Sequence, residues 1–473
     1  MLILGLLCLP AAAGILAYLL PSRPVRLLLL TGTAGLHLVG TGCLWWATDL
    51  STLGGWFAAD ALGLLVLTLL SLVFLAVAVY TIGFLAAEPL HSGRLFIGCM
   101  LGFLSAATLV ALAHHLALVW VGMEATTLTL APLVFYQRTR RSLEAVWKYL
   151  VLSSVGIALA LLGTFFLAAA QVEGRPLILE DLIRTAGSLQ PGLLRAAFIF
   201  LLVGYGTKMG LAPLHSWKPD TYGEAPGPVA ALMAGALTGC AFLGLARATE
   251  VMVAAGQAEF IRPPLVALGL ASLVIAAGFM IGQTDFKRLL AYSSVEHMGI
   301  LSIALAIGGG GAYGAVLHLV GNGLIKGVMF LVAGNIVLLS RSSEASATRG
   351  LLRQAPVTGG VLLAGLFAVS GSPPFGLFIS EFTILGAAFR GGLTWLAVAM
   401  LVMFAIIFVS MAKMLLGMAY GESAESRPLA ETFPLVAGPL ALSGLVLMLG
   451  LYIPGPLHAV LAEAARALGG GPP

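Results

Sequence analysis

Apolar runs follow one another along nearly the whole chain, and short segments with charges, prolines or glycine clusters separate them. A helix that crosses a bilayer needs about 20 apolar residues, so each run predicts a membrane span. The pattern predicts about fourteen spans, at residues 2–20, 27–46, 61–84, 95–112, 116–136, 146–170, 193–214, 229–253, 265–283, 289–307, 313–339, 357–390, 393–418 and 435–451. The expected fold class is therefore an all-α polytopic membrane protein.

Two of these runs are interrupted by proline and glycine. The first interruption is "GYGTKMGLAPLHSW" at 204–217, and the second is "SGSPPFGLFISE" at 370–381. One lies in each half of the chain. Broken helices at corresponding places are typical of transporters built from inverted repeats, whose site lies near the middle of the bilayer. We therefore expect the seventh and twelfth spans to be broken helices.

Composition agrees with a membrane protein and narrows the chemistry. Of 473 residues, 60% are hydrophobic and 9% are charged, whereas soluble domains carry roughly 25% charged residues. The net charge of +4 is spread over many loops, so no nucleic-acid-binding patch is expected. The cysteines lie far apart within apolar runs, without metal-site spacing. We expect no cofactor, metal, cluster or disulfide in this chain.

Loop charges predict the topology. The first run has no basic segment before it, so we interpret it as a retained helix rather than a cleaved signal peptide. With the N-terminus outside, the inner loops receive more arginine and lysine than the outer loops, counting Lys218 and Lys287 as inner and Arg247 as outer. Because basic loops stay on the inner side, this count favours both termini outside.

Several ionisable residues fall inside the predicted spans. A charge at the centre of a spanning helix costs about 2.5–3.5 kcal/mol, so such residues are candidates for function. Glu124 is central in the fifth run, Lys208 lies in the first interruption, and Glu381 follows the second. The structural alternatives are a carboxyl group that only tethers helices and a lysine that reaches the membrane surface. We favour a functional role for all three.

The eleventh run carries a polar stripe. His318, Asn322 and Lys326 stand at i, i+4 and i+8, so they lie on one helix face that drifts by about 40° per step. The stripe could be polar contact between helices. We interpret it instead as part of a hydrophilic track.

Other polar positions are weaker candidates. The secondary site candidates are Lys148, His215, Glu296, His297 and Lys413. Lys148 could reach the surface, and Glu296 with His297 could tether helices. Asp60 is interpreted as a boundary or packing residue. The group Asp285, Lys287 and Arg288 is interpreted as a charged helix start.

Four segments together resemble a known family: "GTKMGLAPLHSWKPDTYGEAPGPVAALMAG" at 206–235, "TDFKRLLAYSSVEHMGI" at 284–300, "LHLVGNGLIKGVMFLVAGN" at 317–335 and "SGSPPFGLFISEF" at 370–382. They resemble the proton-translocating, antiporter-like membrane subunits of respiratory complex I, multi-subunit cation/proton antiporters and group 4 nickel–iron hydrogenases. The likeness is nearest to the hydrogenase 4 component F type.

The resemblance implies a fold and residue roles. Helices four to eight and nine to thirteen would be inverted repeats, with divisions at residues 1–90, 91–255, 260–420 and 430–473. It implies that Glu124 pairs with Lys208, that His318 and Lys326 relay protons, and that Glu381 is the exit-side carboxylate. Two positions depart from the family: Gly239 stands where many members have lysine, and Asn322 stands where a second histidine is common.

The resemblance also implies partners. Since the chain has no redox motif, we expect a non-catalytic proton-translocating subunit of an oxidoreductase complex, of the group 4 hydrogenase or NADH:quinone oxidoreductase kind. Its partners would be other membrane subunits and soluble nickel–iron and iron–sulfur subunits on the cytoplasmic face. Its location would be a bacterial or archaeal inner membrane. The alternatives are a cation/proton channel or antiporter subunit coupled to a non-redox cytosolic partner, for example in inorganic carbon uptake, and an inert scaffold.

Overall fold

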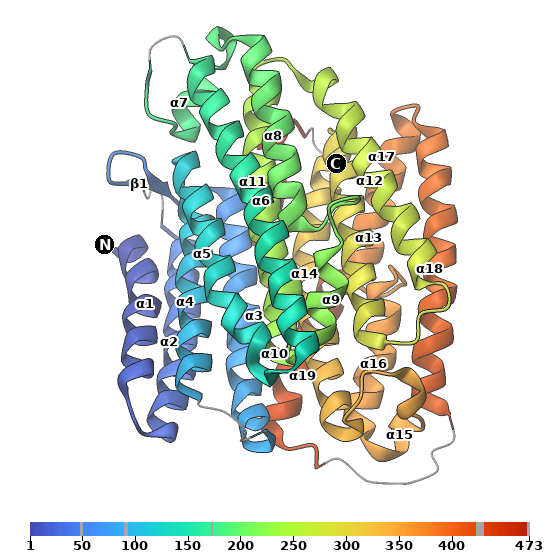
Figure 1. Ribbon diagram of the computed structural model, residues 1–473. Coiled ribbons are helices and arrows are strands. Elements are labelled where there is room, and N and C mark those ends of the chain that lie inside the picture. Colours follow the sequence, from blue (N-terminus) through green and yellow to red (C-terminus); the bar gives the residue numbers. More distant parts are fainter. Residues whose placement is uncertain (48–50, 89–92, 172–173, 422–429, 471–473) are drawn as a thin grey trace.

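Helices that run up and down one common direction make up nearly all of the protein (Figure 1). The structure is a computed structural model, and it describes residues 1–47, 51–88, 93–171, 174–421 and 430–470. The predicted boundary at residues 90/91 lies outside these described residues.

The first half begins with helices α1 Leu2–Leu19, α2 Arg23–Leu44 and α3 Ala61–Ala87, with a small antiparallel hairpin of β1 Ser51–Thr52 and β2 Phe57–Ala58 between the last two. It continues with α4 Gly93–Leu112, α5 Leu116–Val134, η1 Phe135–Gln137, α6 Arg140–Ala170, α7 Leu179–Arg184, η2 Ala186–Ser188, α8 Pro191–Met209, α9 Trp217–Glu224, α10 Gly227–Leu232, η3 Met233–Leu237 and α11 Thr238–Ala254.

The second half contains α12 Ala258–Met280, α13 Phe286–Ile307, α14 Gly310–Ser340, η4 Ala345–Ala347, α15 Leu351–Gln354, α16 Pro356–Val369, α17 Gly376–Arg390, α18 Thr394–Tyr420, α19 Phe433–Leu451 and α20 Gly455–Ala467.

The predicted fold class is confirmed. In the described part of the chain, 13 helices are long and apolar enough to cross a membrane, with α10, η3 and α11 forming one of them. The predicted span at 357–390 is divided into α16 and α17, and neither piece alone reaches the length of a span. The predicted interruptions therefore coincide with real breaks in helix geometry.

The first break has a clear local cause. Helix α8 ends at Met209, and Gly210 follows in the left-handed conformation with φ of 80°. A side chain there would meet the Lys218 side chain at 2.6 Å, so only glycine fits. Pro213 then has no amide hydrogen to continue a helix, and α9 starts at Trp217. The break turns backbone polar groups toward the interior of the bundle.

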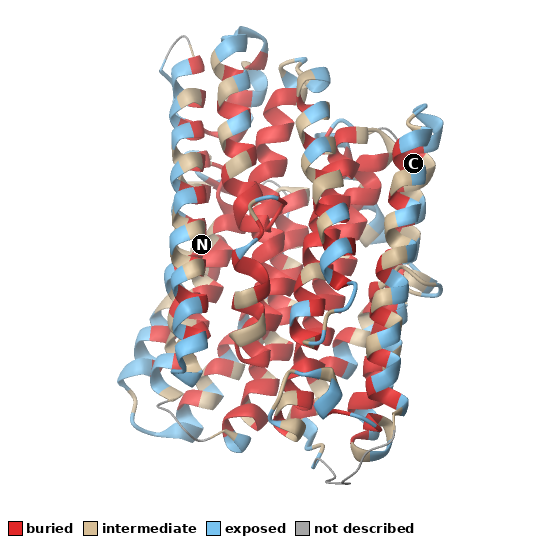
Figure 2. Ribbon diagram, turned by 45° about the vertical axis from the view of Figure 1, so that its right-hand side comes forward, coloured by how far each residue is buried: buried red, intermediate tan, exposed pale blue. Residues whose placement is uncertain are grey.

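The most buried helices lie in the centre, as the red ribbons of Figure 2 show. In the most apolar stretch of the α10–α11 span every residue is buried, and 83% are buried in α14. The corresponding share is 28% in α18, which faces outward. Helix α14 packs against both α3 of the first half and α17 of the second. Polar residues on these central helices therefore lie between the two halves.

Two loop assignments from the sequence are wrong. Lys218 was expected in an inner loop and Arg247 in an outer loop, but both side chains are fully buried. Lys287 is also buried, and its ammonium donates to the carbonyls of Gly223 and Ala225 at 2.6 and 2.7 Å. Lys218 and Lys287 lie at helix starts, where backbone carbonyls receive them, whereas Arg247 lies inside α11 and binds the Asp60 carboxylate.

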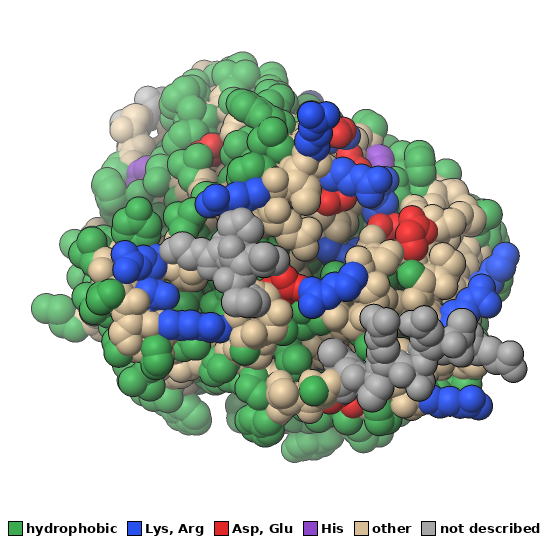
Figure 3. Space-filling view, turned by 60° about the horizontal axis from the view of Figure 1, so that its bottom comes forward, with side chains coloured by type: hydrophobic (Ala, Val, Ile, Leu, Met, Phe, Trp, Pro, Cys, Tyr) green, Lys and Arg blue, Asp and Glu red, His purple; other side chains and the backbone are tan. Residues whose placement is uncertain are grey.

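One end of the bundle is rich in basic side chains. The N-terminal ends of α6 and α13 and the C-terminal ends of α14 and α18 lie at the bottom of Figure 1. Figure 3 turns this end forward and shows lysine and arginine side chains spread over it among apolar ones. We refer to it below as the basic face.

An ion pair between a fully buried arginine and a partly exposed aspartate closes the opposite end of the first half. Asp60 caps α3 and receives two hydrogen bonds from Arg247 of α11, at 2.6 and 2.9 Å, and one from His114 at 3.1 Å. Burial opposes ionisation of Asp60, but Arg247 and His114 outweigh it and hold the pKa of this carboxyl well below its usual value. Asp60 is therefore an ion-pair partner, which is more than the boundary feature expected from the sequence.

Candidate functional site

The first cluster of the site surrounds Lys208 in the last turn of α8. Its ammonium donates to the hydroxyl of Thr127 on α5 and, at 3.4 Å, to that of Tyr149 on α6. It also lies over the Tyr149 ring, 4.8 Å from the centroid. A cation at the C-terminal end of a helix is favoured by the free carbonyls there. Three helices therefore hold one fully buried ammonium group.

Glu124 lies near this lysine but does not touch it. The resemblance implied that Glu124 pairs with Lys208; in the structure one Glu124 oxygen accepts from Ser154 of α6 at 3.2 Å. Its other oxygen has no hydrogen-bond partner among the described residues. The carboxylate is still within electrostatic reach of Lys208. The two charges are thus close enough to interact and far enough apart to leave room between them.

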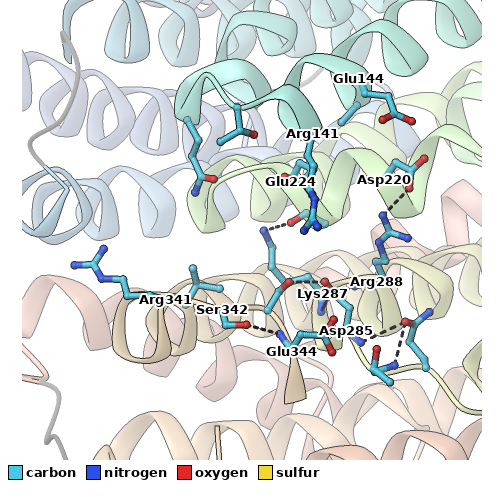
Figure 4. A pocket seen from close by; sticks show the side chains of 18 residues that line it. Arg141, Glu144, Asp220, Glu224, Asp285, Lys287, Arg288, Arg341, Ser342 and Glu344 are labelled. Atoms are coloured by element: carbon cyan, nitrogen blue, oxygen red, sulfur yellow. Dashed lines mark hydrogen bonds and ion pairs between the residues drawn. The ribbon is translucent and has the colours of Figure 1, made fainter. Parts of the chain in front are cut away.

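A polar cavity opens beside this cluster on the basic face. It has a volume of about 670 Å³, and charged side chains of both signs line it (Figure 4). Lys148 binds Asp220 at 2.7 Å and Arg288 binds the same carboxylate at 3.0 Å. Ala145, which lines the cavity, stands one helical turn before Tyr149 on α6, and Tyr149 contacts Lys208. We call this cavity the inner vestibule.

Lys218 connects the first cluster with the second half. It lies on α9, and its ammonium donates to the carbonyl of Met209 at 2.6 Å and of Ser294 at 3.4 Å. Met209 belongs to α8, next to Lys208, and Ser294 belongs to α13. Lys218 is also within electrostatic reach of Lys326. One buried lysine therefore spans the space between the two halves.

The second cluster surrounds Lys326 of α14. Its ammonium donates to Ser293 of α13 at 2.7 Å, and Ser293 in turn donates to Glu296 at 3.3 Å. Glu296 is within electrostatic reach of Lys326. Like the first cluster, this one contains a buried lysine, a hydroxyl and a carboxylate. Glu296 therefore has a larger part in the site than a helix tether.

Two histidines continue the polar track beyond Glu296. His297 Nδ1 and His318 Nε2 are 3.0 Å apart, and His318 Nδ1 lies 2.9 Å from the hydroxyl of Ser380. One ligand atom of each of His297, His318 and Glu381 lies within 4.8 Å of the others. This spacing would fit a metal ion, but the histidines already share a hydrogen bond, which favours transfer of a proton between the rings.

The two departures from the family pattern have different surroundings. Gly239 lies in α11, where an added side-chain carbon would meet only leucines, Leu69 and Leu319, at 3.6 and 3.7 Å. Asn322 is buried on the polar stripe of α14, and its carbonyl oxygen has no hydrogen-bond partner among the described residues. Position 239 is thus apolar, whereas position 322 stays polar.

The remaining candidates are dispersed. His215 is nearly buried in the first break, and its ring lies 6.3 Å from that of Tyr292. Lys148 belongs to the inner vestibule through Glu144 and Asp220. Lys413 is exposed on α18, in a separate groove. The structure therefore brings Glu296 and His297 to the main candidates and leaves Lys413 apart from them.

Sequence reasoning missed three side chains of the candidate site. Tyr149 and Ser293 are partners of the buried lysines, but a single tyrosine or serine in a spanning helix carries no sequence signal. Lys218 did carry one, since it follows the first interruption within the same motif as Lys208. Treating that whole motif as buried would have identified it.

Comparisons with known proteins agree with this geometry. Residues 113–408 match the family model for the membrane region of NADH:quinone oxidoreductase and Mrp antiporters. The chain is 35% identical over 419 residues to the hydrogenase-4 component F homolog of Methylacidiphilum infernorum, covering 85% of this chain and 86% of that protein.

A second relative and a solved structure extend the likeness. NADH-quinone oxidoreductase subunit N of Halorhodospira halophila is 30% identical over 415 residues, covering 86% of this chain and 84% of that one. The membrane-bound sulfane sulfur reductase, an archaeal respiratory membrane complex, contains a chain with a TM-score of 0.89 and 21% identity, over 99% of this chain and 98% of that chain. The last match shows a shared fold.

Proposed function

This chain belongs to the NADH:quinone oxidoreductase/Mrp antiporter family of membrane proteins, and from that premise we propose that it moves protons through its two clusters as an antiporter-like subunit of a redox-driven complex. The observation that carries the proposal is the line of buried lysines in the middle of the bundle. Lys208, Lys218 and Lys326 are each 0% exposed, and each donates to polar groups from another helix. Charges this deep are costly and are kept where ions or protons move.

The path begins in the inner vestibule. Asp220 lines its wall and binds Lys148, and the hydroxyl of Tyr149, next to Lys148 on α6, accepts a hydrogen bond from Lys208. A proton taken up at this wall passes to the first cluster through the tyrosine hydroxyl and water. Glu124 holds the resulting positive charge by its proximity.

The middle of the path depends on Lys218. Lys218 donates to the carbonyl of Met209, the residue that follows Lys208, and it acts electrostatically on Lys326. Like charges repel, so charging one lysine favours release of a proton from the next. Lys218 on α9 thereby connects the two clusters. Position 239, where many family members have a lysine, cannot do so here, because it is a glycine in apolar surroundings.

The path ends at Glu381. Glu296 and His297 are adjacent on α13, and His297, His318 and Glu381 stand within one transfer step of one another. A proton that leaves Lys326 passes to these groups and then to Glu381 on the broken twelfth span. Glu381 delivers it to the side of the membrane opposite the basic face.

The energies are of matching size. Moving one proton against about 150–200 mV requires roughly 3.5–4.6 kcal/mol. Leaving a buried charge without its partner costs about 3–5 kcal/mol. Moving the charge of Glu124 away from Lys208, or that of Glu296 away from Lys326, removes an electrostatic attraction, and the cost of a buried charge without its partner is the upper bound of the energy available for one proton.

Partners and location follow from the relatives. The names hydrogenase-4 component F homolog and NADH-quinone oxidoreductase subunit N favour a redox-driven complex over a non-redox cytosolic partner. We place other membrane subunits beside this chain and soluble nickel–iron and iron–sulfur subunits on the basic face. The basic face is then cytoplasmic, both termini are outside, and the membrane is a bacterial or archaeal inner membrane.

The test uses the assembled complex in proteoliposomes. Lys208→Met and Lys326→Met should each lower proton uptake per electron transferred by at least about ten-fold, since each removes a titrating group from the path. Arg353→Met, which changes an exposed residue of α15, is the matched control and should pump normally. If both lysine variants pump like the wild type, the proposed path is wrong.

A further inference from the structure

A groove on the lipid-facing side of the second half is separate from the proton path. It has a volume of about 880 Å³ and runs between the end of α12 and the C-terminal part of α18. Its lining is mainly apolar, including Met280, Ile281, Ile406 and Val409. Lys413 lies within it, and Arg349 lies at its edge. The proton path does not use these two basic residues.

Aromatic residues place α18 in the bilayer. Trp395 and Tyr420 stand near its two ends and are 58% and 67% exposed. They are separated by about 38 Å along the helix, which matches the distance between the two interfaces of a bilayer, where tryptophan and tyrosine gather. Lys413 is about 10 Å inward from Tyr420. Its side chain can therefore reach back to the headgroup level but not into the cytoplasm.

The basic side chains of the groove outnumber the described acidic ones. Neither Lys413 nor Arg349 forms an ion pair with any described acidic residue. Among the described lining residues, Glu344 is the carboxylate, so these residues carry two positive charges and one negative charge. Ser346 and Ser410 also line the groove, and the Ser410 hydroxyl donates to the carbonyl of Ile406 at 2.9 Å. A single anion with oxygen acceptors would complete this set.

Small residues give such an anion access. Gly417 stands one turn beyond Lys413 on α18, and an added side-chain carbon there would meet nothing within 4 Å. One turn further, Gly421 is in contact with the stem of Arg349. The surface of α18 between the two cations is therefore free of bulky side chains. The apolar residues of the groove lie further from the membrane–water interface.

We propose that this groove binds one phospholipid with an anionic headgroup, whose phosphate lies between Lys413 and Arg349 and whose acyl chain follows the apolar wall. Basic pockets between spanning helices on the cytoplasmic side are suited to anionic headgroups. A helix of another subunit laid in the groove would bury both cations against hydrocarbon unless it supplied its own acid. A phospholipid supplies the negative charge at the interface and the apolar tail below it.

The test measures lipid retention by the purified full chain. Native mass spectrometry in an uncharged detergent compares phosphatidylglycerol with phosphatidylcholine of the same acyl chains. The wild type should retain phosphatidylglycerol preferentially. Lys413→Gln and Arg349→Gln should each weaken this retention by about five-fold, because each basic group near the surface contributes about that factor. The double variant should weaken phosphatidylglycerol retention by about the product of the two single factors.

A control and a second variant make the result decisive. Arg353→Gln changes an exposed basic residue that does not line the groove, and it should leave retention unchanged. Lys413→Arg keeps the charge and should retain the lipid even if Lys413→Gln folds poorly. Equal retention of both lipids by the wild type would overturn the proposal. So would a loss in Arg353→Gln as large as in Lys413→Gln. Loss of a partner subunit from the assembled complex that carries these variants, with phosphatidylglycerol retained by the purified chain as before, would overturn the proposal and assign the groove to a protein.

Discussion

Removing one charge from the Asp60–Arg247 pair should destabilise the first half strongly. Asp60→Asn keeps the shape of the side chain, and asparagine caps a helix as well as aspartate does. The change therefore leaves α3 capped and removes only the negative charge. Arg247, fully buried, would then face His114 and Glu250 without its main partner.

The size of the effect follows from burial. Breaking a buried ion pair by removing one partner costs about 3–5 kcal/mol, because the remaining charge stays desolvated. Glu250 is within electrostatic reach of Arg247 and offsets part of this cost. We expect Asp60→Asn to lower the free energy of unfolding by about 3 kcal/mol. The assay is equilibrium unfolding in mixed micelles, followed by the loss of helix signal.

A double-mutant cycle separates the pair from its surroundings. Arg247→Gln alone should also destabilise, whereas Asp60→Asn with Arg247→Gln should cost less than the sum by about 2–3 kcal/mol. Since the folded pKa of Asp60 is depressed, its stabilisation is present at neutral pH and begins to fall as the pH drops below about 4. Additive single costs, or an Asp60→Asn loss below about 1 kcal/mol, would refute the reasoning.

Three further predictions concern the site and its support. Tyr149→Phe removes a hydroxyl partner of Lys208 and should slow coupled proton uptake by about ten-fold, measured with a pH-sensitive dye in proteoliposomes. Glu381→Gln should abolish proton release while Glu381→Asp keeps part of it; full release by the glutamine variant would remove Glu381 from the path. Gly204→Ala places a carbon 2.6 Å from the backbone of α6 and should lower unfolding stability by about 1–3 kcal/mol. Gly192→Ala, which meets nothing within 4 Å on the same helix, is its control and should show no loss.

The spans and the two breaks were predictable because each depends on local sequence. A run of about 20 apolar residues has few alternatives to a membrane helix, and glycine with proline interrupts it by removing a hydrogen bond. Gly210 shows this directly, since its φ of 80° ends α8 where the sequence predicted an interruption.

The candidate site was predictable only in part. Lys208, Lys326 and Glu381 stand out because a charge in an apolar run has no other simple explanation. Lys218 and Arg247 did not: Lys218 stands between two predicted runs, where charges are usually in loops, and Arg247 stands near the end of the run at 229–253. The chain around Lys218 turns inward and Arg247 lies inside α11, so both residues are buried by tertiary packing.

The hydrogen-bond partners of the site residues could likewise be predicted only in part. Sequence spacing placed His318 and Lys326 on one face of α14, which agrees with their contacts. It could not identify Ser293 as the partner of Lys326, or show that Glu124 lies beside Lys208 without touching it. Such pairings depend on how α5, α6, α8, α13 and α14 pack. Because these helices lie far apart in the sequence, local sequence spacing does not reveal the pairings.

Lys218→Met provides the most direct test of a continuous path through both halves. The side chain is replaced by an apolar one of similar length, while Lys208 and Lys326 remain in place. Proton uptake per electron should be measured in proteoliposomes that hold the assembled complex, with single-turnover uptake recorded at the vestibule side. We predict that sustained proton transport falls by at least about ten-fold while the first uptake step survives. Wild-type transport in this variant would contradict a path that crosses from one half to the other through Lys218.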